Sequence, residues 1–210
     1  RLAAAGAAWL AAHANDDGGW GDTVGSPSNL STTLLAAAAL RRLSAGGGGA
    51  ASAGRWLEAR LGGPATPQAA ARALKAVYGS DRTFAVPILS FLALTGEGAD
   101  DWRSVPPLPF ALALLPRGLY RLARLQVVSY ALPALVAVGL CRHVCAARER
   151  GGWAWGRLLA GALLRRLERL QPAHGGFLDA IPLTAFVCLA LRRAGYGGHA
   201  VALKGLAFLR

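Results

Sequence analysis

Short helical patterns, each closed by glycine or proline, run along the whole chain and constrain its fold more than any other feature. Alanine and leucine dominate these patterns, whereas isoleucine occurs only at Ile88 and Ile181. Alanine and leucine favour helices, and β-branched residues favour strands. No segment shows a convincing alternation of apolar and polar residues, which would indicate a strand. The sequence therefore predicts an all-α fold.

Local signals place the ends of several predicted helices. Asn29 or Ser31 can cap one helix, and Thr66-Pro67 supplies an N-cap and a first-turn proline for another. We expect Pro87 to begin a helix of its own. The predicted ranges are 2–14, 31–44, 50–61, 68–78, 87–96, 158–170, 182–194 and 200–210. Many short helices joined by brief loops are typical of a repeat array.

Composition and charge narrow the function classes. Hydrophobic residues make up 54% and charged residues 16% of the chain, which excludes a disordered tail. The net charge is +12, but the arginines do not form one basic stripe with interleaved aromatic residues. We therefore expect no nucleic-acid partner. The odd set of Cys141, Cys145 and Cys188 predicts free thiols in a reducing compartment.

The most apolar stretch, residues 108–140, raises the question of a membrane. Its densest part, residues 127–140, is shorter than the roughly 20 residues that span a bilayer. We expect either a core helix or a peripheral membrane contact, because arginines flank the stretch and could face anionic headgroups. These arginines are Arg117, Arg121, Arg124 and Arg142.

A glycine-glycine-aromatic turn after a helix occurs twice, at residues 6–20 and 167–177. The segment 204–210, of the form K-G-x-x-F-L, matches the opening of a further copy. Glycines permit a tight turn, and an aromatic ring there can bury a large area. The residues that define the two turns are Gly18, Gly19, Trp20, Gln171, Gly175, Gly176 and Phe177.

This pattern resembles the QW repeat of triterpene cyclases, in which a glutamine at a helix end stacks on the tryptophan of the turn. The resemblance implies an α/α toroid, here as an incomplete ring over residues 1–210 whose two ends look cut. Two positions depart from the repeat. Ala14 replaces the glutamine in the first copy, and Arg166 replaces the aromatic residue in the second.

A second resemblance is to the squalene-hopene cyclase run L-A-L-x-G … W … V-P-P-E. It is carried by residues 92–96, by Trp102 and by residues 105–107. Tyr130, within Ser129-Tyr130-Ala131, stands where that family has an aromatic side chain in its substrate cavity. The acid after V-P-P is replaced by Leu108. The resemblance implies an aromatic-lined cavity that stabilises carbocations, with candidate residues Tyr130, Phe84, Phe91 and Trp102.

The family identity would make the full-length protein a class II terpene cyclase acting on squalene or a related linear isoprenoid. Such enzymes protonate the substrate with the middle aspartate of a D-x-D-D motif, kept protonated in an apolar cavity. Residues 1–210 contain no such motif. For the pairs Asp16-Asp17 and Asp100-Asp101 we expect a solvated or capping role. We therefore name no catalytic residue here, expect the acid beyond residue 210, and expect this stretch alone to be inactive.

The remaining site chemistry is sparse. Cys141, His143 and Cys145 lack ordinary zinc spacing and a fourth ligand. Nothing presents the Asp-Cys-His zinc set of the protein prenyltransferases that share the toroid. We expect no metal and no cofactor, a hydrophobic isoprenoid as substrate, and peripheral or monotopic attachment on the cytoplasmic side of a membrane. The alternative is a non-catalytic toroid that binds an isoprenoid or a protein partner.

Overall fold

The computed structural model describes residues 2–43, 48–96, 102, 104–106, 132–149 and 154–210. The chain divides into two compact units, Arg1–Pro106 and Pro107–Arg210, each with its own core. The described residues form α-helices and short 3₁₀ turns and contain no β-strand. The predicted all-α class is therefore confirmed for them.

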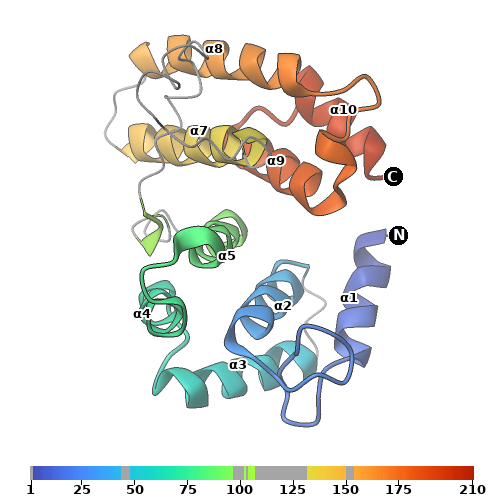
Figure 1. Cartoon of the computed structure of the whole chain (residues 1–210), viewed down its shortest axis with the longest axis vertical. Coiled ribbons are helices and arrows are strands. Elements are labelled where there is room, and N and C mark those ends of the chain that lie inside the picture. Colours follow the sequence, from blue (N-terminus) through green and yellow to red (C-terminus); the bar gives the residue numbers. More distant parts are fainter. Residues whose placement is uncertain (1, 44–47, 97–101, 103, 107–131, 150–153) are drawn as a thin grey trace. The chain divides into compact units, whose positions relative to one another are not determined.

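The first unit is built around α2 (Leu30–Arg42), which packs against α1 (Leu2–Ala12), α3 (Gly48–Leu61) and α5 (Arg82–Thr95) (Figure 1). The fifth helix of this unit, α4 (Pro67–Tyr78), packs mainly on α5. Most of α2 is buried, and its run of alanines lets the neighbouring helices approach closely. The large side chains buried around α2 include Leu34, Leu40, Leu57, Leu74 and Leu94.

The second unit is organised around α7 (Leu132–Glu149) and α9 (Ile181–Ala194), which share its most extensive helix contact. The helix α8 (Ala154–Leu170) packs on α7, and α10 (Ala200–Phe208) packs on α9 and α8 (Figure 1). A 3₁₀ turn at Phe177–Asp179 precedes α9. Leucine and valine fill this core: Val136, Leu140, Val144, Leu163, Leu167, Val187 and Leu191.

Both predicted N-caps are confirmed. The Asn29 side chain accepts a hydrogen bond from the Thr32 N–H at 2.9 Å, and Asn29 is the cap of α2. The Thr66 hydroxyl accepts from the Ala69 N–H at 3.2 Å, with Pro67 as the first residue of α4. Each cap satisfies a backbone donor that the helix itself cannot.

The prediction that Pro87 begins a helix is wrong. The helix α5 begins at Arg82 and contains Pro87 in its interior. Proline lacks an N–H, so the carbonyl four residues earlier loses its helical partner. Pro87 is exposed, and water can bind that carbonyl in its place. A proline in the second turn is therefore tolerated, and the helix includes residues that the sequence assigned to a loop.

The apolar stretch 108–140 is described only from residue 132 onward. That part belongs to α7, where Val136, Ala137 and Leu140 are fully buried. Residues 132–140 are therefore core, as one of the two expectations had it. Within the described part of the chain, every helix is too short or too polar to cross a bilayer.

The helix α1 differs from the others in how little of it is covered. Ala7 is its one buried residue, and Leu2 is 66% exposed. A Cβ added at Gly6 would meet no atom within 4 Å. This helix therefore presents apolar surface on several sides.

We predict that Thr66→Ala lowers the free energy of unfolding by about 1 kcal/mol, because the Ala69 N–H loses its acceptor. Thr66→Ser keeps the hydroxyl and should retain most of the stability. Urea denaturation of the three proteins measures the difference. Equal stability of Thr66→Ala and the parent protein would show that this cap contributes nothing.

Candidate functional site

The first glycine-glycine-aromatic turn is fixed by hydrogen bonds to its backbone. Gly18 has a φ of 85°, which favours glycine. The Asp17 carboxylate accepts from the Gly19 N–H at 2.9 Å. The next N–H, that of Trp20, donates to the hydroxyl of Thr33 in α2 at 3.0 Å. Trp20 and Thr33 are both buried, so this bond directs the indole into the core.

The second turn repeats these contacts with different side chains. Gly175 has a φ of 91°. The Nδ1 atom of His174 accepts from the Gly176 N–H at 3.2 Å, in the place of the Asp17 carboxylate. The Phe177 N–H donates to the hydroxyl of Thr184 in α9 at 2.9 Å. Phe177 and Thr184 are fully buried.

Each turn also packs against a helix further along the chain. The first turn, which follows α1, packs on α3, and the second turn, which follows α8, packs on α10. A Cβ at Gly18 would meet Ser52 of α3 at 3.0 Å. A Cβ at Gly175 would fall on the carbonyl oxygen of Lys204 in α10. The second glycine of each turn faces an aromatic ring one helical turn further along the same helix. Gly19 faces Trp56 of α3, and Gly176 faces Phe208 of α10. We call each set of turn glycines, buried threonine and receiving helix a turn clamp.

The receiving helices of the two turn clamps carry the same short pattern. In α10 it is Gly205-x-x-Phe208-Leu209, which the sequence singled out as the opening of a further copy. In α3 it is Ala53-x-x-Trp56-Leu57, which sequence reasoning missed. The signal for α3 was the identical spacing of a small residue, an aromatic residue and leucine. The pattern K-G-x-x-F-L does not match α3, because Ser52 and Ala53 stand there in place of the lysine and the glycine.

The side-chain hydrogen bonds that hold the turn to its neighbouring helix differ between the two turn clamps. Gln171 donates to the carbonyl oxygens of Gly175 and Val201, both at 2.9 Å, and so joins the end of α8 to the start of α10. Ala14 holds the corresponding place in the first turn and has no polar group. There the indole N–H of Trp20 donates to the Leu10 carbonyl of α1 at 3.0 Å. Both arrangements tie the turn to a neighbouring helix through a backbone carbonyl.

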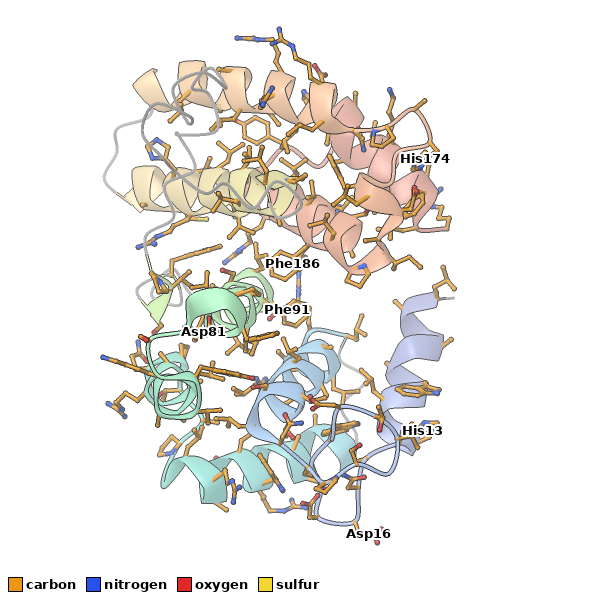
Figure 2. All side chains as sticks on the ribbon, viewed as in Figure 1. His13, Asp16, Asp81, Phe91, His174 and Phe186 are labelled. Atoms are coloured by element: carbon orange, nitrogen blue, oxygen red, sulfur yellow. The ribbon has the colours of Figure 1, made fainter. Side chains whose placement is uncertain are left out.

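Asp17 is the polar centre of the first turn clamp. Its carboxylate accepts from the Ser28 hydroxyl at 2.6 Å and from the Trp56 indole N–H at 2.9 Å, in addition to Gly19. These hydrogen bonds, that of Ser28 first, hold the pKa of Asp17 below its ordinary value because they favour the charged form. In the second clamp His174 lies with its ring centre 5.6 Å from that of Phe208 (Figure 2).

The predicted cavity aromatics that the structure describes have different surroundings. Phe84 is 57% exposed and stacks on Tyr78 with ring centres 5.7 Å apart. Phe91 is half-buried in α5. Trp102 is buried, and its indole N–H has no hydrogen-bond partner among the described residues. Tyr130 lies outside the described residues.

A cavity of about 490 Å³ lies in the first unit among α2, α3, the start of α4 and the end of α5. Of the predicted aromatics that the structure describes, Phe84, Phe91 and Trp102, none lines this cavity. The hydroxyls of Thr66 and Thr95 are occupied by backbone groups. The volume is in the range of small-molecule sites. The wall offers polar groups as well as aliphatic side chains, so it can hold a ligand with an apolar body. The lining residues include Leu34, Ala38, Gly54, Leu57, Ala70 and Leu92, with Arg41 and Glu58 as its charged members.

The other groups that the sequence raised make no further site. Asp16 is exposed, and the pair at residues 100–101 lies outside the described residues. Cys141 is fully buried in α7. Within the described ranges, no three histidine, cysteine or acidic side chains are grouped so that they could hold a metal ion.

Comparisons with protein-family models, with curated proteins and with solved structures find no match to this chain. The turn clamps and the cavity of the first unit are the features of the described residues that bear on function.

We predict that Asp17→Asn destabilises the protein at neutral pH and that the difference disappears in acid. The folded pKa of Asp17 lies below the ordinary 3.8, so its stabilising effect is present above that pH. The effect is lost as the pH falls through the folded pKa. Urea denaturation of both proteins at neutral pH and below pH ~3 measures the difference.

Asp16→Asn is the matched control, because Asp16 is exposed beside Asp17. It should leave the free energy of unfolding unchanged at both pH values. A constant difference between Asp17→Asn and the parent protein across this range would contradict the assignment.

Proposed function

We propose that this chain is part of an α/α toroid protein of the class II terpene cyclase type. The observation that carries the proposal is the presence of two turn clamps, one in each unit, built from QW-like sequences. In both, a glycine-glycine-aromatic turn joins one helix to the helix two further along. Such a repeated fastening is what a ring of stacked helix pairs requires, since each pair must be fixed to the next.

The chemistry we propose for the whole protein is cyclisation of squalene or a related linear isoprenoid. It begins with protonation of a terminal alkene by an aspartic acid and proceeds through carbocations. Residues 1–210 supply no D-x-D-D motif, so this proposal requires the acid from other residues of the protein. The part of residues 1–210 would be to form ring segments and to line an apolar site. Phe91, Phe84, Trp102 and Tyr130 remain our candidates for stabilising positive charge.

A non-catalytic protein that binds an isoprenoid is the second candidate, and the cavity favours it. Among the described residues, the wall of that cavity includes several aliphatic side chains and no aromatic ring. The aliphatic part of the wall can hold a hydrocarbon chain through buried apolar area.

We also propose peripheral or monotopic attachment to the cytoplasmic side of a membrane. An isoprenoid of this kind is almost insoluble in water, so its binding protein must draw it from a bilayer. The arginines first considered for this contact, Arg117, Arg121 and Arg124, lie outside the described residues, and Arg142 is half-buried in α7. Burial lowers the pKa of the Arg142 guanidinium, as expected for a cation removed from water.

We predict that the complete protein, expressed from the full reading frame that contains these residues, converts squalene to polycyclic products. Gas chromatography with mass spectrometry identifies the products. Changing the central aspartate of a D-x-D-D motif in that frame to asparagine should abolish them. A complete frame without the motif, and without product, would reject the cyclase and leave the binding protein.

We predict that Gly54→Leu lowers the affinity of the chain for radiolabelled squalene in mixed micelles by about tenfold. A Cβ at Gly54 meets no atom within 4 Å, so the added side chain can extend into the cavity without a clash. Replacing a helical glycine should also raise stability by about 0.5–1 kcal/mol.

Gly6→Leu is the matched control, because Gly6 is an equally open helical glycine away from the cavity. It should gain similar stability and bind squalene as the parent protein does. Equal binding by both variants would show that the ligand does not occupy this cavity.

A further inference from the structure

The cavity of the first unit has an apolar floor and a polar mouth. Its described lining residues include a buried set and an exposed set, and the two sets differ in chemistry. The buried set is entirely apolar: Leu34, Ala38, Leu57 and Ala70. The exposed set is entirely polar: Arg41, Glu58 and Thr66. A ligand that covers the buried floor with an apolar body therefore places its other end among polar groups at the mouth.

The mouth carries one cation and one anion that are not paired with each other. Arg41 lies in the last turn of α2, and Glu58 lies in α3. Within the described part of the chain neither of them makes an ion pair, and the pairs that do form there lie in the second unit. Both charges can therefore interact with a group that enters the cavity.

Two threonine hydroxyls in the cavity wall each retain one hydrogen-bonding capacity. The Thr66 hydroxyl accepts from the Ala69 N–H at 3.2 Å and keeps its own proton for another acceptor. The Thr95 hydroxyl donates its proton to the Phe91 carbonyl at 2.8 Å, and its oxygen can still accept. The wall therefore offers one neutral donor and one neutral acceptor in addition to the two charges.

This balance of donors and acceptors favours a ligand with a neutral head group. A carboxylate or a phosphate would be attracted by Arg41 and repelled by Glu58, and an ammonium group would experience the reverse. Either ion would also lose hydration on entering the cavity, and this loss costs far more for an ion than for a hydroxyl. A hydroxyl both donates and accepts, so it can bind Glu58 and Arg41 together.

We infer that this cavity binds an isoprenoid alcohol, with the chain on the buried floor and the hydroxyl at the mouth between Glu58 and Arg41. The inference rests on the isoprenoid-binding function proposed above as the second candidate, and it names the class of ligand. Squalene has no polar group, so it can contact the floor but forms no hydrogen bond at the mouth. An isoprenoid alcohol complements both parts of the wall.

The test compares ligands that share one isoprenoid chain, by displacement of radiolabelled farnesol from the protein in mixed micelles at neutral pH. The ligands are farnesol, its methyl ether, farnesoic acid and farnesylamine. Farnesol should bind most tightly. The ether cannot donate to Glu58, so it should bind about tenfold more weakly than farnesol. The acid and the amine should also bind more weakly, because each meets a like charge at the mouth.

Two variants should change this selectivity in opposite directions. Glu58→Gln removes the charge that repels farnesoic acid, whose affinity should rise about fivefold. Arg41→Gln removes the charge that repels farnesylamine, whose affinity should rise by a similar factor. Misfolding would lower the affinity for every ligand, so it cannot produce these gains. The matched controls, Asp16→Asn and Arg42→Gln, remove exposed charges that do not line the cavity, and they should bind every ligand as the parent protein does.

The outcomes separate this inference from the function on which it rests. A parent protein that binds neither farnesol nor squalene would overturn both. If squalene binds and farnesol binds no more tightly than its ether, isoprenoid binding stands and the assignment of an alcohol is wrong. Tighter binding of farnesoic acid than of farnesol would identify an anionic amphiphile as the ligand and overturn the inference. Undiminished farnesol binding by Gly54→Leu would place the alcohol outside this cavity and overturn it as well.

Discussion

Each unit depends on one place where a turn glycine approaches a neighbouring helix so closely that a Cβ would be in tight contact or would not fit. In the second unit Gly175 lies against the carbonyl of Lys204, and in the first Gly18 lies against Ser52. This approach fixes the distance between the turn and the receiving helix. The aromatic residue that follows then enters the core, because its N–H reaches a buried threonine. The position of three helices thus follows from one contact between main chains.

Side-chain chemistry is secondary to this contact. A carboxylate and an imidazole accept the same backbone N–H in the two turns, at Asp17 and His174. An indole and an amide donate to backbone carbonyls of the helices next to the turns, at Trp20 and Gln171. The helices fastened in this way leave room for a cavity in the first unit. This cavity has both aliphatic and polar groups in its wall, which suits a ligand with an apolar body.

The sequence predicted the helical class, the N-caps and both turns, because capping and turn formation depend on residues close together in the chain. It did not predict that Trp56 receives the first turn, since α3 meets that turn only through the fold. It also missed the start of α5, because the cost of Pro87 depends on whether water reaches the freed carbonyl. The cavity was not predictable from residue types. Its wall combines four helices, and local patterns do not show which faces meet.

The two turn clamps have a consequence for how such proteins diverge. Within one chain, the glutamine, the tryptophan and the acidic residue have each been exchanged, while the paired glycines and the threonine are present in both copies. The two copies thus share their small residues and the spacing of these residues, and they differ at the prominent aromatic and amide positions. A profile weighted on glutamine and tryptophan would match each copy at only one of those two positions. One weighted on Gly-Gly-aromatic, buried threonine and small-x-x-aromatic-Leu would find both.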